Sequence, residues 1–109
     1  IRDSCYPVAK MVSDNEADKG IISCMSGIGA VITANKVKGA RAGLCHTEYL
    51  ARQGVEHDDM NILCIGSKIA DHNIIENIID EFLNAKFLTD EKYSRRLNKV
   101  IDIENSEST

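Results

Sequence analysis

The stretch with the clearest chemical potential starts at Cys24, which ends a short apolar run and is followed by Ser26, Gly27, Ile28 and Gly29. A turn that leads from a strand into a helix presents backbone N–H groups and the positive end of the helix dipole, so it can hold an anion. A thiol beside such a terminus has a stabilised thiolate, which can act as a base or a nucleophile. The simpler alternative is a tight corner next to a buried core thiol. Spacing alone leaves both interpretations open.

Two further groups of ionisable side chains follow. His57 lies at the end of a predicted helix, where it could carry a proton with Asp58 or a substrate hydroxyl as its partner, or simply cap the helix. Basic residues gather on one face of the last predicted helix, namely Lys92, Arg95, Arg96 and Lys99. Arginine can bind a phosphate dianion through two parallel hydrogen bonds. The alternative is a solvated charged face, which is what most charge runs on helices form.

Apolar periodicity predicts the elements that must position these side chains. Short continuous apolar runs predict strands at 19–24, 40–45 and 61–66. Helical spacing predicts helices at 6–16, 30–36, 47–57, 71–83 and 90–103. The expected N-caps are Asp71 for the fourth helix and His46 or Thr47 for the third. We therefore expect a single domain over residues 1–103 and a frayed polar tail over 104–109.

Short apolar strands that alternate with helices indicate a parallel sheet covered on both faces. The predicted class is α/β, with a Rossmann-like three-layer α/β/α arrangement. Ligands in such folds gather at the carboxyl ends of the strands, where Cys24, His46 and Lys68 stand. Three strands are few for an open sheet. This number suggests further strands ahead of this segment, or pairing with a second subunit.

Composition and charge exclude several classes of function. A chain of 109 residues is long enough for one domain, and its net charge of −4 gives no basic surface for nucleic acid. No apolar run reaches the length of a membrane span, so we expect no membrane association and a cytoplasmic location. The four cysteines lie about twenty residues apart, without the close pairs of zinc ribbons, and are expected to be reduced. The three histidines are also too far apart along the chain to favour a metal site.

The glycine turn does not match the known phosphate-binding fingerprints. A dinucleotide-binding turn would have a third glycine where Ile32 stands, and the chain has no Walker loop. The turn is therefore a generic anion site or a plain corner, and we expect no cofactor.

Three segments in this order, "GIISCMSGIGAVITANKVKGARAGLC", "EHDDMNILCIGSKIA" and "YSRRLNK", resemble the ribose-5-phosphate isomerase B family, whose relatives include the galactose-6-phosphate isomerase subunits. The resemblance runs from about Val8 to Ile103. It implies that Cys24 is the catalytic base and that His57 opens the sugar ring. The family's first strand and its Asp-His loop have no counterpart here, because the chain begins after them.

The same resemblance implies a substrate-binding set that surrounds these two residues. The loop amides and hydroxyl of the family fall on Ser26, Gly27, Ile28 and Gly29, and Asn35 follows in the same helix. The tail arginine that binds phosphate falls on Arg96. Four positions depart from the family: Met25 stands where glycine is usual, Asp58 replaces asparagine, and Lys68 and Lys92 replace arginines.

The function implied by the resemblance is an aldose–ketose isomerase that interconverts ribose 5-phosphate and ribulose 5-phosphate through an enediolate, a step of the pentose phosphate pathway. Preorganised donors near a base are what such proton transfer requires. No metal is implied. The implied partner is a second copy of the chain, in a homodimer or homotetramer with a shared active site, and the apolar stripe from Leu97 to Ile103 is an expected interface. A hexose 6-phosphate isomerase and a non-catalytic phosphate-binding relative remain alternatives.

Overall fold

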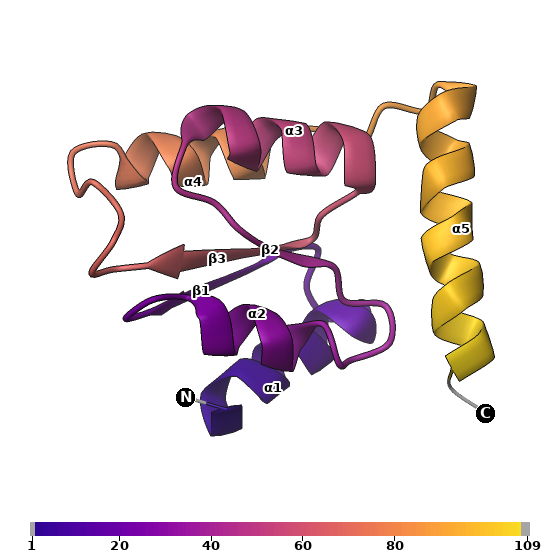
Figure 1. Ribbon diagram of the computed structural model, residues 1–109, viewed down its shortest axis with the longest axis horizontal. Helices are drawn as coiled ribbons and strands as arrows, with labels where there is room; N and C mark the ends of the chain where they lie inside the picture. Colours follow the sequence, from indigo (N-terminus) through magenta and orange to yellow (C-terminus); the bar gives the residue numbers. More distant parts are fainter. Residues whose placement is uncertain (1, 108–109) are drawn as a thin grey trace.

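The computed structural model describes residues 2–107, with the side chain of Arg2 left aside. Its elements in chain order are α1 (Arg2–Ser13), β1 (Gly20–Cys24), α2 (Ile28–Ala34), β2 (Ala42–Leu44), α3 (Glu48–Asp58), β3 (Ile62–Gly66), α4 (Ile75–Asn84) and α5 (Glu91–Glu107). Figure 1 shows the sheet between two pairs of helices, with α5 standing at one side. The predicted α/β three-layer arrangement is confirmed.

The sheet is parallel, with the strand order β1-β3-β2. The register pairs Gly20 with Ile62 at one end of β1 and Cys24 with Gly66 at the other. All five residues of β3 are buried, as expected for a central strand of continuous apolar sequence. The carboxyl ends of β1, β2 and β3 therefore share one edge of the sheet, which we call the carboxyl edge, and the opposite edge is the amino edge.

Alternate side chains of β3 enter two separate cores. Ile62 and Cys64 pack with Ile22 against α1 and α2. Leu63 and Ile65 pack with residues of α3 and α4 on the other face, Phe82 among them. Figure 1 shows these two helix pairs on opposite sides of the strands. None of the helices within residues 2–107 is both long and apolar enough to cross a membrane.

Two helix starts differ by four residues from the sequence prediction. Helix α1 begins at Arg2 instead of residue 6, because Cys5 and Ala9 form a buried pair at helical spacing that extends the apolar face toward the N-terminus. Helix α4 begins at Ile75 instead of residue 71. The Asp71 carboxylate accepts a hydrogen bond from the Asn73 N–H at 2.9 Å and closes a local turn, so the prediction of Asp71 as the helix cap was wrong.

Two other helix termini give one confirmation and one correction. Thr47 caps α3, because its hydroxyl accepts a hydrogen bond from the Leu50 N–H at 3.1 Å. Helix α5 continues through Glu107, so residues 104–107 are helical and the prediction of a frayed tail there was wrong. Part of the reason is a contact with the body of the protein, in which the Gly39 N–H donates to Glu104 Oε2 at 3.0 Å. Residues 108 and 109 of the predicted tail lie outside the described residues.

Helix α5 touches the body of the protein at separate places. Tyr93, near its start, is the buried residue of this helix, and Glu104 binds Gly39 near its end. A cavity of about 860 Å³ lies between them, bordered by α5, α3 and β2. The apolar residues of α5 that line it are Leu97, Val100 and Ile103.

Candidate active site

Cys24 is the last residue of β1 and lies at the carboxyl edge. Its side chain shares the face of β1 with Ile22 and packs against the core under α1 and α2, yet it remains partly exposed. The other three cysteines are buried, and all four are free thiols, which confirms the prediction of reduced cysteines. Cys24 is therefore the thiol that solvent can reach.

Burial distinguishes the remaining thiols chemically. It raises the pKa of Cys45 from 9.0 to about 11. Burial, with smaller contributions from the charges of the other three thiols, raises the pKa of Cys64 to about 12. The pKa of Cys5 is also raised, chiefly by burial and then by the nearby Cys24. These three groups stay protonated near neutral pH and serve as small apolar core residues.

The loop after Cys24 is shaped by close packing around two glycines. Gly27 has φ 83°, a left-handed conformation that favours glycine, and it begins α2. A Cβ at Gly27 would lie 2.3 Å from Leu44 Cδ1, and a Cβ at Gly66 would lie 2.4 Å from the Ser26 carbonyl oxygen. The loop therefore rests directly on the end of β3, where a methyl group cannot fit.

Backbone hydrogen bonds fasten this loop to the segment after β3. The Ser67 N–H donates to the Cys24 carbonyl at 2.7 Å, and the Lys68 N–H donates to the Met25 carbonyl at 2.9 Å. Lys68 thus lies at the carboxyl edge beside the Cys24 loop, and its side chain is exposed. The structure brings together six predicted site residues here, namely Cys24, Ser26, Gly27, Ile28, Gly29 and Lys68.

Ser26 and Gly29 occupy the open side of the loop. The exposed Ser26 hydroxyl accepts a hydrogen bond from the Ile28 N–H at 3.3 Å, so this amide already has a partner within the loop. A Cβ at Gly29 would meet no atom within 4 Å. Unlike Gly27, Gly29 is therefore not required by packing within the chain, and the space beside it can admit a ligand.

Asn35 lies at the far end of α2 and does not join this group. Its Nδ2 donates to the Ala42 carbonyl at 3.0 Å, and its Oδ1 accepts from the Ala42 N–H at 2.8 Å. Both ends of the side-chain amide are therefore engaged by the backbone of β2. This geometry gives Asn35 a structural role at the start of β2, and its predicted contact with substrate stays a prediction.

His57 lies at the amino edge, in the last turn of α3. Its half-buried imidazole stacks on the ring of Tyr93, with the ring centroids 4.4 Å apart and the planes at 15°. Lys92 Nζ lies 4.9 Å and Arg96 Cζ lies 5.8 Å from the centroid of the same Tyr93 ring. Asp58 is exposed next to His57 and lines the cavity under α5. Three predicted site residues, His57, Lys92 and Arg96, therefore meet at the Tyr93 ring, and Asp58 follows His57 in the chain.

The two groups lie at opposite ends of the strands. The Gly20 N–H donates to the Asn61 carbonyl at 2.9 Å, which places the segment after His57 at the start of β1. A five-residue strand separates this point from Cys24 by about 13 Å. One chain thus carries two separate groups of predicted site residues, which we call the carboxyl-edge half-site, around Cys24, and the amino-edge half-site, around His57. Lys68 belongs to the first, and Lys92 and Arg96 belong to the second.

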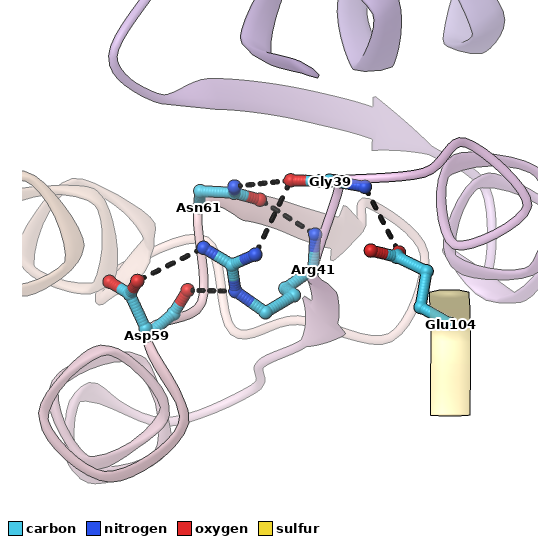
Figure 2. Close-up of polar contacts among 5 residues, drawn as sticks. All are labelled: Gly39, Arg41, Asp59, Asn61 and Glu104. Atoms are coloured by element: carbon cyan, nitrogen blue, oxygen red, sulfur yellow. Dashed lines mark hydrogen bonds and ion pairs between the residues drawn. The ribbon is translucent and has the colours of Figure 1, made fainter. Parts of the chain in front are cut away.

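A polar network supports the amino edge. Figure 2 shows the Arg41 guanidinium binding Asp59 twice, through Nε to the backbone carbonyl at 2.8 Å and through Nη2 to Oδ2 at 3.0 Å. Asp59 has φ 52° and forms the C-cap of α3, directly after the helix turn that holds His57. Asn61 Nδ2 donates to the Gly39 carbonyl at 2.9 Å, and the Gly39 N–H in turn binds Glu104 of α5. The network therefore connects the end of α3, the start of β3 and α5.

Sequence reasoning did not assign Arg41, Asp59, Glu104 or Tyr93 to a site. Tyr93 lies within the predicted last helix, but a position on a helix does not reveal which ring its side chain faces. Arg41 and Asp59 lie 18 residues apart and follow no periodic pattern. Among residues 2–107 no group of three or more histidine, cysteine or acidic side chains is placed to hold a metal ion.

Comparisons with known proteins give concordant results. The model of the Ribose/Galactose Isomerase family matches residues 2–100. Galactose-6-phosphate isomerase subunit LacB of Clostridium acetobutylicum is 41% identical over 107 residues, which cover 92% of this chain and 61% of that protein. Ribose-5-phosphate isomerase B of Escherichia coli is 34% identical over 89% of this chain and 64% of that protein. The chain thus spans less than two thirds of the length of both relatives.

A solved structure extends the likeness to three dimensions. Type B ribose 5-phosphate isomerase from Trypanosoma cruzi is 42% identical and superposes with a TM-score of 0.94, over 96% of this chain and 70% of that one.

Proposed function

Because the chain belongs to the ribose/galactose isomerase family of sugar-phosphate isomerases, we propose that it interconverts ribose 5-phosphate and ribulose 5-phosphate. The observation that carries this proposal is the pairing of a partly exposed thiol, Cys24, with open space beside Gly29 at the start of α2. The relatives named above contribute the substrate class. The fold and the order of the motifs along the chain support the same assignment.

In the proposed reaction the Cys24 thiolate removes the proton from C2 of the open-chain aldose. The electron pair of that C–H bond forms the C1–C2 double bond of an enediolate, and the carbonyl oxygen at C1 takes the negative charge. The O2 hydroxyl proton then passes to O1 as the C2=O2 double bond forms. The electron pair of the C1–C2 double bond takes up at C1 the proton that returns from Cys24, so the aldose becomes the ketose without net oxidation. In this proposal the amides of Gly27 and Gly29 and the Ser26 hydroxyl stabilise the oxyanion, since all three belong to the stretch that follows Cys24 and leads into α2.

His57 would move the protons that open the furanose ring, and Arg96 with Lys92 would bind the phosphate dianion. These groups lie at the amino edge, so one chain cannot bring them to its own Cys24. We propose that a second copy supplies them, in a homodimer or homotetramer. Three apolar side chains beside the Cys24 loop support such contact, since Met25, Ile28 and Ile32 are 55%, 53% and 56% exposed.

The first experiment replaces Cys24 by serine. We expect kcat/KM for ribose 5-phosphate to fall about 10²- to 10⁴-fold because the base is lost, while the thermal unfolding midpoint stays unchanged. Full activity in Cys24→Ser would remove Cys24 from the mechanism. Sugar-phosphate-dependent thermal stabilisation without turnover by the unaltered chain would favour the non-catalytic alternative instead.

A mixing experiment tests the shared site. Cys24→Ser and His57→Ala are each expected to be inactive, and random exchange of their subunits should restore about a quarter of the activity, because half of the dimers then hold one intact composite site. Equal amounts of unaltered chain and Cys24→Ser serve as the reference for exchange. No recovery after verified exchange would place Cys24 and His57 of one chain in the same site.

The likeness to galactose-6-phosphate isomerase subunit LacB favours a hexose 6-phosphate as a second candidate substrate. Galactose 6-phosphate and ribose 5-phosphate should therefore be assayed side by side, and the larger kcat/KM identifies the substrate. Four free thiols fit a reducing compartment, and we propose that the enzyme acts in the cytoplasm.

A further inference from the structure

Tyr93 holds a position that the proposed mechanism does not use. It is the buried residue of α5, and His57, Lys92 and Arg96 all lie against its ring. These three residues come from two helices, since His57 ends α3 while the others belong to the first two turns of α5. Tyr93 is therefore the point at which the proposed ring-opening group and the proposed phosphate-binding groups meet.

The way in which His57 is held is unusual for a functional histidine. Within the part of the chain that the structure describes, no group forms a hydrogen bond or an ion pair with its ring. The imidazole is oriented through its face, by a near-parallel stack with centroids 4.4 Å apart and planes at 15°. A ring held by its face keeps both Nδ1 and Nε2 for a ligand, whereas a ring held by a hydrogen bond gives up one of them.

A backbone hydrogen bond between the segment before α5 and the end of α3 adds a second restraint beside the stack. The Leu88 N–H donates to the Glu56 carbonyl at 3.0 Å, so the segment that leads into α5 is fastened to the residue before His57. The Tyr93 N–H donates to the Asp90 carbonyl at 3.0 Å in the first turn of α5. These two hydrogen bonds set the direction in which the chain enters α5, and from there the Tyr93 ring stacks on the imidazole.

We propose that Tyr93 is a positioning residue, which orients the His57 imidazole by stacking and keeps it at a fixed place relative to Lys92 and Arg96. This inference rests on the proposed function for its kinetic consequence, but the stack itself is independent of the reaction. The ring matters here and the hydroxyl does not, so phenylalanine should replace Tyr93 and an aliphatic side chain of similar size should not.

The kinetic test compares Tyr93→Leu with Tyr93→Phe in the full chain, with Tyr49→Leu as the matched control. Tyr49 lies in the first turn of α3, away from His57; it is 59% exposed, and its ring has Arg52 Cζ 5.8 Å from its centroid. We expect Tyr93→Leu to lower kcat/KM for ribose 5-phosphate about tenfold, while Tyr93→Phe and Tyr49→Leu stay within about twofold of the unaltered chain.

An isotope effect separates positioning of His57 from general damage. If ring opening becomes the slow step in Tyr93→Leu, the primary isotope effect with 2-deuterio ribose 5-phosphate should fall toward one. A variant that merely loosened the Cys24 loop would keep or increase that isotope effect. Unchanged kcat/KM and an unchanged isotope effect in Tyr93→Leu would overturn the proposal.

A measurement without turnover distinguishes failure of this inference from failure of the proposed function. Inorganic phosphate is titrated while the His57 ring signals are followed by nuclear magnetic resonance. We expect phosphate bound near Lys92 and Arg96 to shift the His57 signals in the unaltered chain and in Tyr93→Phe, but not in Tyr93→Leu. The same response in all three proteins would refute the positioning role, even if no sugar phosphate were isomerised.

Discussion

The carboxyl-edge and amino-edge half-sites differ in how they are held. The loop around Cys24 is fixed by the backbone: two hydrogen bonds fasten it to Ser67 and Lys68, and Gly27 and Gly66 allow main-chain contact without side chains between. The amino-edge half-site is held by side chains, through the Tyr93 stack and the Arg41 network. Under the proposed function, Cys24 must meet a carbon acid within a fraction of an ångström, and it is the group that the backbone positions.

Among the changes that test how the two half-sites are held, Gly66→Ala is expected to lower stability most. The added methyl group would lie 2.4 Å from the Ser26 carbonyl oxygen, which is main chain and cannot rotate away. We expect the free energy of unfolding to fall by about 3 kcal/mol, measured by urea denaturation. If Gly66→Ala unfolds at the same urea concentration as the unaltered chain, the loop is not fixed by this contact.

The second effect comes from alkaline pH and tests the core under the carboxyl edge. Burial raises the pKa of Cys45 from 9.0 to about 11, so the unfolded thiol ionises first as pH rises. Stability from this group is complete below pH 9 and is lost as pH rises toward about 11, with a slope of about 1.4 kcal/mol per pH unit. Chemical denaturation between pH 8 and pH 11 measures it.

Cys45→Ala isolates that contribution from other groups that titrate in the same range. Its unfolding free energy should fall less steeply with pH than that of the unaltered chain. Parallel pH profiles for the two proteins would show that Cys45 ionises equally easily in the folded and unfolded states.

A smaller effect is expected from Arg41→Met at the amino edge. The variant keeps the apolar stem but loses the two hydrogen bonds to Asp59, and Asp59 is partly exposed and can be hydrated in their place. We expect a loss of about 1 to 2 kcal/mol in the free energy of unfolding. The informative control is the hydrogen exchange of backbone amides, which should accelerate at the end of α3 and in α5 while the Cys24 loop stays protected. Equal acceleration at both edges would mean that the half-sites are not held independently.

The smallest change in stability is expected from Gly29→Ala. A methyl group there meets open space, and alanine is the better helix former, so stability should stay equal or rise by up to about 1 kcal/mol. Under the proposed function the same methyl group obstructs the ligand, and kcat/KM should fall about tenfold or more. A Gly29→Ala protein with normal kcat/KM would show that substrate does not approach this side of α2.

The layers of this fold could be predicted from the sequence because each strand is a short, nearly continuous run of apolar residues. The segment from Ile62 to Gly66 has no polar side chain, which indicated a central strand buried on both faces, and all five residues are buried. The position of His57 could also have been foreseen: a residue that precedes a strand lies at the amino edge, whereas Cys24 follows one. The resemblance supplied the residue roles but not this separation, because relatives are compared as linear patterns.

Other features left no trace in the sequence. Asn35 binds Ala42 seven residues away across a turn, and its amide would look the same if it faced a substrate. The stack of Tyr93 on His57 joins residues from different helices, and their spacing follows neither the period of a helix nor that of a strand. Helix α4 starts later than predicted because Asp71 closes a local turn and does not cap the helix. An aspartate favours both of these arrangements, so the sequence could not distinguish them.

The amide of Asn35 also determines where this sheet can grow. β2 has only three residues. The Ala42 N–H and C=O groups, which a neighbouring strand would otherwise bind, are hydrogen-bonded to the side-chain amide of Asn35. An incoming chain would have to displace that amide before it could pair along β2, so this margin is protected against edge-to-edge association. A further strand, from a longer polypeptide or from another molecule, would therefore pair with the outer side of β1, the strand that ends at Cys24.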